Sequence, residues 1–159
     1  MTATYEAIAT TTLSSAAASV SFSSITGSFT DLVVVISATQ GSFDNTGLRF
    51  NDDTGSNYSK TVIYGTGSAA GSARDTSSSS MRIMIAGTTL SSTVWHIMNY
   101  SNTTTYKTAL CRSDIASDQT RGGVGLWRST SAITKLTFLA ESGNFGSGST
   151  FTLYGIKAE

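Results

Sequence analysis

Residues 94–110 read VWHIMNYSNTTTYKTAL, two alternating apolar runs on either side of a polar turn. In the first run Val94 and His96 fall on one face of an extended chain, and Trp95 and Ile97 fall on the other, because side chains alternate along a strand. The second run has the same period of two. This stretch therefore predicts two β-strands, and it sets the pattern for the rest of the chain.

His96 is the only histidine of the chain. Catalytic imidazoles usually stand at strand ends or on loops beside a second titratable group, whereas His96 lies in mid-strand with apolar neighbours on its face. We expect a structural histidine; a general base or metal ligand is the alternative.

Short alternating segments recur outside this stretch at turn-punctuated intervals, and no segment keeps a helical apolar stripe. The sequence predicts an all-β protein, an antiparallel jelly-roll β-sandwich in a single domain spanning residues 1–159. About ten or eleven strands are expected, at 5–13, 16–25, 31–39, on either side of a hairpin turn at 51–55, and at 81–87, 93–101, 105–113, 122–129, 132–141 and 149–158. Residues 65–80, GTGSAAGSARDTSSSS, have no periodicity and are expected to form a mobile surface loop.

Strand edges need protection in such a fold, and the chain contains no proline. The continuous apolar run DLVVVISAT, 31–39, is typical of a central strand. We expect the edge strands to be protected by charges, by bulges at Gly122 and Gly123, or by pairing with another subunit.

Charge and composition disfavour several classes of partner. Ten basic and ten acidic residues cancel and are scattered, so neither nucleic acid nor a membrane is an expected partner. Roughly a third of the chain is Ser or Thr, which suits the solvent face of strands. No apolar stretch is long enough to span a membrane and no secretory signal is recognisable, so the chain is expected to be soluble.

No motif predicts catalysis, and we expect neither enzymatic activity nor a cofactor. The glycine stretches 65–71 and 143–149 match neither a nucleophile elbow nor a phosphate loop. Asp52 and Asp53 are adjacent in a turn, where a solvated hairpin is favoured over a calcium site. Cys111 is the only cysteine, which excludes a cysteine cluster for zinc; a buried side chain is favoured over a reactive thiol.

Aromatic residues suggest one binding function. Trp127, beside Arg128 near a strand end, is the best candidate for stacking on a sugar, and Tyr106 is a second. A tryptophan at the edge of the core is the favoured interpretation of Trp127.

Five blocks of the sequence resemble a family of small virion structural proteins encoded by tailed bacteriophages of marine and freshwater bacteria, including cyanophages. The resemblance covers nearly the whole chain. It differs from the usual family pattern, which has proline in YEPIA and SSIPG, at Ala7 and Thr26. The blocks are YEAIATTTLSSAAASVSFSSI, LRFNDDTGSNYS, HIMNYSNTTTYKT, GLWRSTSAIT and the distinctive closing GSGSTFTLYGIKA.

This resemblance implies a head decoration or cement protein, a homotrimer that binds the major capsid protein on the outer surface of the phage head. The expected capsid contacts are Tyr5 and Glu6, in a polar arm at 2–6, and Arg74 and Asp75, in the loop. The alternative is a tail-fibre or receptor-binding tip module that recognises host glycans through Tyr106, Trp127 and Arg128.

Overall fold

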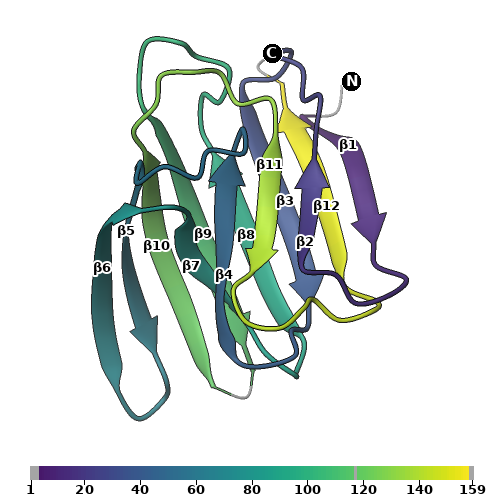
Figure 1. Ribbon diagram of the computed structural model, residues 1–159, viewed down its shortest axis with the longest axis vertical. Coiled ribbons are helices and arrows are strands. Elements are labelled where there is room, and N and C mark those ends of the chain that lie inside the picture. The colour runs from purple at the N-terminus through teal and green to yellow at the C-terminus, as the bar shows by residue number, and fades with distance from the viewer. Residues whose placement is uncertain (1–3, 117, 158–159) are drawn as a thin grey trace.

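The computed structural model describes residues 4–116 and 118–157 and is all-β, with no helix in these ranges. Two antiparallel sheets pack face to face as a single-domain β-sandwich (Figure 1). The large sheet has the spatial order β1 (Tyr5–Thr12), β12 (Thr150–Ile156), β3 (Asp31–Ala38), β8 (Ser91–Ile97), β9 (Lys107–Ile115), β10 (Gln119–Trp127), β5 (Tyr58–Gly65) and β6 (Ala70–Ser78). The small sheet has the order β2 (Ser19–Phe22), β11 (Leu136–Ala140), β4 (Asp44–Phe50) and β7 (Met81–Ala86).

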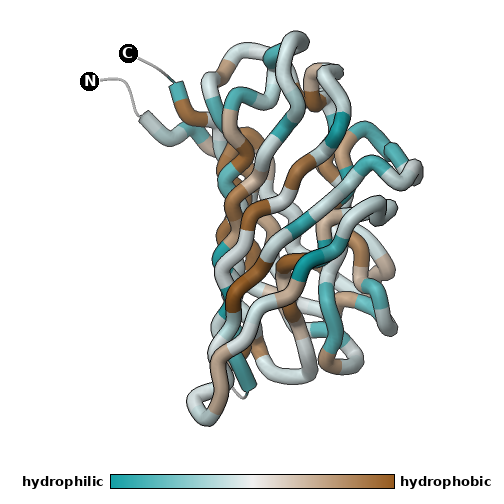
Figure 2. Tube along the Cα trace, turned by 90° about the vertical axis from the view of Figure 1, so that its left-hand side faces the viewer, coloured by the Kyte–Doolittle hydropathy of each residue, from teal (hydrophilic) through white to brown (hydrophobic). Residues whose placement is uncertain are grey.

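The core lies between the sheets and is built from alternate residues of their strands. Trp95 is fully buried on β8, as are Phe138 on β11 and Phe151 on β12. The Phe138 and Phe151 ring centroids lie 5.7 Å apart across the sandwich. Each such side chain contributes about 1.5–3 kcal/mol by leaving water. Figure 2 shows the alternation behind this core, with brown apolar segments interrupted by pale and hydrophilic ones along the strands.

Two sequence predictions about the large sheet are confirmed. Residues 31–38 form β3, a central strand hydrogen-bonded to β12 and β8. The opening stretch contains β8 and β9, which pair antiparallel, with Trp95 opposite Cys111.

The predicted loop at 65–80 is wrong, because most of it is β6. Residues 66–69 make a tight turn, in which the Thr66 N–H donates to the Ala69 carbonyl, and β6 then pairs antiparallel with β5. Most side chains of β6 are exposed. An edge strand that contributes nothing to the core needs no apolar alternation, so the sequence shows no strand pattern there.

The predicted hairpin at 51–55 is also wrong. This turn follows β4 in the small sheet and leads to β5 in the large sheet, so the two strands that flank it do not pair. Asn51 and Asp52 have φ values of 52° and 57°. Turn-forming residues specify a reversal of the chain but not whether the next strand returns to the same sheet.

Gly122 and Gly123 do not form an edge bulge. They lie within β10, an interior strand whose pairing with β9 and β5 runs without a register shift. Gly123 and Gly125 face β7 instead: a Cβ on Gly123 would lie 2.7 Å from Val62 Cγ1 and 2.8 Å from the Thr61 carbonyl oxygen, and one on Gly125 would collide with Met81. These glycines let β7 pack closely on the large sheet.

Candidate interaction surface

The outer face of the large sheet carries a row of exposed apolar side chains, which we call the outer patch. Its members come from β3, β9, β10 and β5, with the half-buried Val94 of β8 completing the row. Their exposed fractions are 41% to 68%, although each lies well inside the sheet rather than at its edge. The four exposed members are Val35, Leu110, Val124 and Ile63. An apolar surface spread over adjacent strands is typical of an interaction site.

Pairing across the strands places apolar side chains opposite one another at two points of this patch, while Arg112 is opposite Val94 and His96 is opposite Leu110. Val35 is opposite Val94, and Leu110 is opposite Val124, so their side chains lie on the same face of the sheet. Gly122 leaves a hollow in it, because a Cβ there would find no atom within 4 Å. Val94, Leu110 and Arg112 line this hollow.

Two charged side chains of β9 accompany the patch. Arg112 and Asp114 line a shallow depression with Val94 on the outer face. Neither side chain makes a hydrogen bond or an ion pair with the residues the structure describes. One free cation and one free anion beside apolar side chains suit a protein surface that presents both signs of charge.

His96 lies on the same face but has a structural partner. Its Nε2 is 3.1 Å from Oδ2 of Asp31, and Oδ1 of Asp31 accepts a hydrogen bond from the Asn99 N–H at 2.7 Å. Asp31 thus ties the start of β3 to the end of β8 and its following turn. The sequence predicted apolar neighbours in mid-strand, and this is wrong: His96 is the penultimate residue of β8 and lies beside the carboxylate of Asp31.

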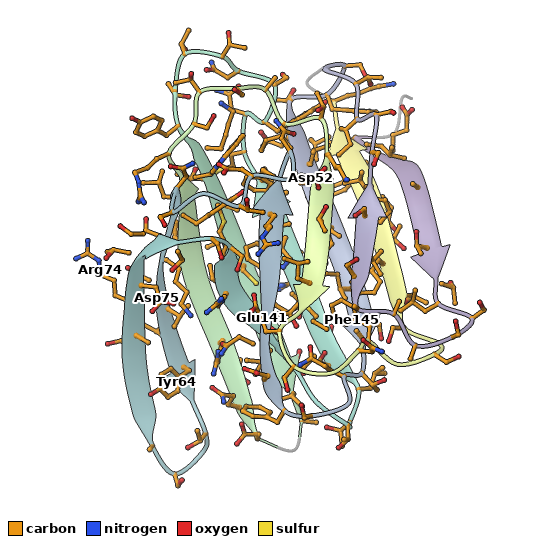
Figure 3. The ribbon with its side chains drawn as sticks, in the orientation of Figure 1. Asp52, Tyr64, Arg74, Asp75, Glu141 and Phe145 are labelled. Atoms are coloured by element: carbon orange, nitrogen blue, oxygen red, sulfur yellow. The ribbon has the colours of Figure 1, made fainter. Side chains whose placement is uncertain are left out.

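The residues expected to touch the capsid lie at opposite ends of the large sheet. Tyr5 and Glu6 belong to β1 at one edge, and Arg74 and Asp75 belong to β6 at the other. The expected arm is instead a paired strand from Tyr5 onwards, while Thr2 lies outside the described residues. In Figure 3, Arg74 projects away from the molecule and Asp75 turns inward. The fold therefore does not bring these four residues together.

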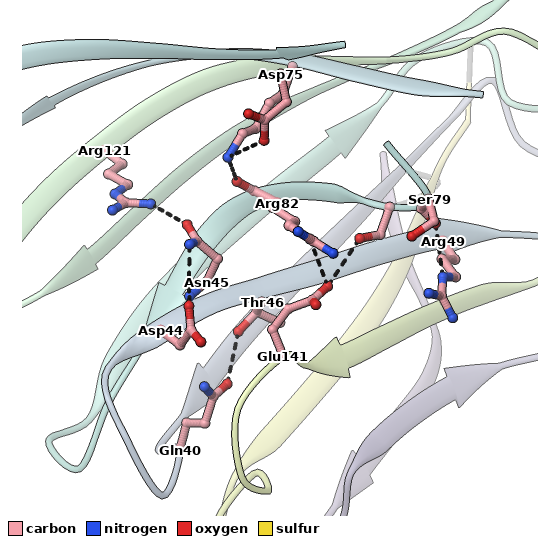
Figure 4. Close-up of polar contacts among 12 residues, drawn as sticks. Gln40, Asp44, Asn45, Thr46, Arg49, Asp75, Ser79, Arg82, Arg121 and Glu141 are labelled. Atoms are coloured by element: carbon pink, nitrogen blue, oxygen red, sulfur yellow. Dashed lines mark hydrogen bonds and ion pairs between the residues drawn. The ribbon is translucent and has the colours of Figure 1, made fainter. Parts of the chain in front are cut away.

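Asp75 belongs to a polar network in the gap between β5, β6 and the small sheet (Figure 4). Lys60, only 9% exposed, donates from Nζ to the Arg82 carbonyl at 2.5 Å and pairs with Asp75 at 3.1 Å. Glu141 Oε1 lies 3.1 Å from Ser80 Oγ and 3.2 Å from Arg82 Nε. These two ion pairs join the two sheets, although the buried Arg82 Nε makes no hydrogen bond.

The sugar-binding alternative loses its principal residue. Trp127 is 3% exposed, stacks on Tyr58 at 6.3 Å between ring centroids, and donates from Nε1 to Asp53 at 2.7 Å. Arg128 donates to the Ser56 carbonyl. Tyr106 is 56% exposed and stands alone of the three as an accessible ring. Trp127 is therefore the core-edge tryptophan that the sequence favoured.

The two carboxylates of the acidic turn are both paired with protein donors, Asp53 inside the turn and Asp52 on the surface. Asp53 accepts from Trp127, from Asn57 Nδ2 at 2.9 Å and from the Gly55 N–H at 2.8 Å, and Asp52 pairs with Lys135 at 2.7 Å. Within residues 4–116 and 118–157, no group of three His, Cys, Asp or Glu side chains is placed to hold a metal ion.

Cys111 lies on the inner face of β9 and is fully buried, as its residue type predicts. Burial raises the pKa of its thiol well above the usual value, so the reactive thiolate is disfavoured.

In the part of the chain that is described, no helix is long and apolar enough to cross a membrane. No protein-family model and no curated protein matches the sequence.

Solved structures with a weak likeness to this chain include two enzymes. One is a sucrose-6-phosphate hydrolase from Lactobacillus gasseri, with a TM-score of 0.39 and 11% identity over 89% of this chain. This chain spans only 28% of that hydrolase. The other is a variant of the alginate lyase Aly36B in complex with an alginate tetrasaccharide, with a TM-score of 0.37 and 10% identity over 94% of this chain and 80% of that one. Likenesses this weak carry no functional argument.

The sequence alternation placed Leu110 and Arg112 on one face of a strand, but it did not identify them as functional. Only the position of the small sheet decides that this face points outward. A leucine and an arginine with two-residue spacing are otherwise unremarkable in a strand.

Proposed function

We propose that this protein is a non-enzymatic virion structural protein of a tailed bacteriophage, a head decoration protein that binds the outer capsid surface. The sequence resemblance suggests the class. The outer patch is the observation that carries the proposal, because exposed leucine, isoleucine and valine on an interior part of a sheet are stabilised when another protein covers them. The occupant we assign to the patch is the surface of the major capsid protein.

The charge of the molecule supports a protein partner. Its formal net charge is zero, so the long-range attraction that draws proteins to packaged DNA is absent. Arg112 and Asp114 offer one charge of each sign beside the apolar row. Such mixed polar groups at the rim of an apolar contact set its orientation more than its strength.

The mechanism follows from the breadth of the large sheet. A contact that spans β3 to β5 crosses five neighbouring strands, so one copy can bridge two adjacent capsid subunits. Each interface is modest, but many copies act together over the shell. Bridging of this kind resists the outward pressure of packaged DNA.

We also infer that the sandwich is a jelly roll. The order β1-β12-β3-β8 in the large sheet faces β2-β11-β4-β7 in the small sheet. Along the chain these eight strands cross between sheets at every step except from β4 to β7. The β5–β6 and β9–β10 hairpins extend the large sheet beyond β8. Eight strands in two Greek keys are the framework of jelly rolls, which occur among viral capsid proteins.

The test is binding of purified protein to tail-free phage heads, with localisation on intact virions by labelling. We expect label over the head. Leu110→Asp should weaken binding to heads by about tenfold or more, because a carboxylate would be buried against the shell. The matched control is Leu90→Asp, which changes another exposed leucine, 60% exposed against 49% for Leu110, in the turn before β8.

Two results would overturn the proposal. Label confined to the tail would favour the receptor-binding alternative, in which case Tyr106 is the ring to mutate. Equal loss of binding in both leucine variants, or in neither, would reject the outer patch as the capsid contact.

A further inference from the structure

The two sheets have four end strands, and three of them are closed to further pairing. β2 has only four residues. β6 carries Arg74 and Asp75, shifts register against β5, and has a positive φ of 58° at Ser77. Short length, charge and local irregularity are the usual ways in which proteins protect sheet edges.

The edge of β7 is closed differently, by side chains from the large sheet. Lys60 Nζ donates to the Arg82 carbonyl, and Ser113 Oγ contacts both the N–H and the carbonyl of Ile85. Ser113 is itself held by Thr93 at 2.7 Å. The backbone groups that β7 would offer to another strand are thus occupied inside the sandwich.

β1 has such features only in its first half, where it carries Glu6 and shifts register between Ala7 and Ala9. Its eight residues, YEAIATTT, pair only with β12 among the described strands, and seven of the eight side chains are exposed. A register shift at Ile8 interrupts its first half, but the second half, Ala9 to Thr12, pairs regularly. Alternate N–H and carbonyl groups of this regular half point away from β12 because antiparallel strands bond on both sides.

The side chains of β1 are held by β12, so its open edge is ordered in advance. Tyr5 packs edge-on against Tyr154 at 6.4 Å, and Thr10 Oγ1 donates to Thr152 Oγ1 at 3.2 Å. Glu6 is the one charge on the strand, and Lys157 neutralises it at 2.5 Å. Because these side chains are already ordered, pairing with another strand would cost little side-chain entropy. No net charge on β1 opposes the approach of that strand.

We propose that β1 of one copy pairs antiparallel with β1 of a second copy around Thr10, joining the two large sheets into one. A second copy fits because antiparallel pairing about a two-fold axis is self-complementary. With the axis at Thr10, Thr10 meets Thr10, Thr11 meets Ala9 and Thr12 meets Ile8, while Glu6 does not face its own copy. Opposed threonines form favourable cross-strand pairs.

This interface makes a two-fold dimer rather than the homotrimer that the family resemblance implies. Only β12 separates β1 from Val35, the nearest member of the outer patch, but Thr10 is not part of that patch, so dimerisation can be tested independently of capsid binding.

The experiment compares Thr10→Lys with Thr152→Lys by light scattering after size exclusion and by sedimentation velocity, at tens of micromolar protein. Both substitutions remove the same threonine hydrogen bond and add the same charge, but only Thr10 lies on the edge strand. We expect a dimer for the wild type and for Thr152→Lys. Thr10→Lys should weaken dimerisation at least about tenfold, because two lysines would face each other across the axis.

A second variant, Thr10→Cys, provides a direct test of the contact. Oxidation should link two copies through this residue, while the buried Cys111 stays reduced. A monomeric wild type overturns the proposal, as does a dimer or trimer that Thr10→Lys leaves intact and Thr10→Cys does not cross-link. Circular dichroism establishes that each variant is folded.

Discussion

At the scale of single residues, polar side chains at the ends of the sandwich find their partners far away in the sequence. Asp53 is an example: it follows β4, yet it accepts a hydrogen bond from Trp127 at the end of β10. Burial alone would raise the pKa of this carboxyl. The hydrogen bonds from Trp127, Asn57 and Gly55 outweigh burial and hold the pKa below its usual value of 3.8.

This depressed pKa predicts acid sensitivity. A carboxyl with a lower pKa in the folded state contributes stability above its unfolded value, near pH 3.8, and loses that contribution as the pH falls through the folded value. Asp53→Asn should lower the free energy of unfolding at pH 7 by about 1–2 kcal/mol and flatten its decline in acid. Urea unfolding between pH 2.5 and 7 measures both.

The comparison variant for this prediction is Asp52→Asn. Asp52 makes an exposed ion pair with Lys135, which solvent screens, so its removal should change stability less. Equal effects at the two adjacent aspartates would mean that the Trp127 contact contributes nothing specific.

At the scale of elements, the position of β7 depends on glycines in another sheet. Gly123 and Gly125 of β10 leave room for Ile83 and Met81. This close approach brings the β7 edge within reach of Lys60 and Ser113. The glycines that the sequence suggested as an edge bulge therefore serve packing between sheets.

Two adjacent glycines of β10 should differ sharply in their response to substitution by alanine. Gly123→Ala places a Cβ 2.8 Å from the Thr61 carbonyl oxygen and should destabilise the protein by about 1–3 kcal/mol through overpacking. Gly122→Ala enters open space and should change stability by less than about 0.5 kcal/mol. Urea midpoints with unchanged m-values are the measurement, and equal midpoints for the two variants would contradict the packing argument.

At the scale of the whole molecule, strands distant in sequence are neighbours in space. β1 pairs with β12, with Tyr5 opposite Ile156. Folding must therefore bring together segments that are far apart in the sequence before these pairings stabilise the chain. The entropy cost of closing such long loops makes the folding of β-sandwiches slow. The chain has no proline, so it lacks prolyl isomerisation.

We expect refolding in milliseconds to seconds, without a major phase of tens of seconds. The fluorescence of Trp95 and Trp127, both buried, should report it after stopped-flow dilution from urea. In double-jump experiments the protein is unfolded for a variable delay and then refolded, and the refolding rate should be the same for every delay. A rate that changes with this delay would contradict the prediction.

Local alternation was enough to predict an all-β sandwich and a central strand at 31–38, and the residue type was enough to predict a buried Cys111. These depend on a period of two and on the burial of apolar side chains, which each segment encodes by itself. Tertiary structure alone decided which sheet each strand joins. It therefore also decided that 51–55 links two sheets, that 70–78 is an edge strand, that Leu110 and Arg112 face outward and that β1 remains open. Such properties arise from pairing between distant segments, and no single segment carries the information for them.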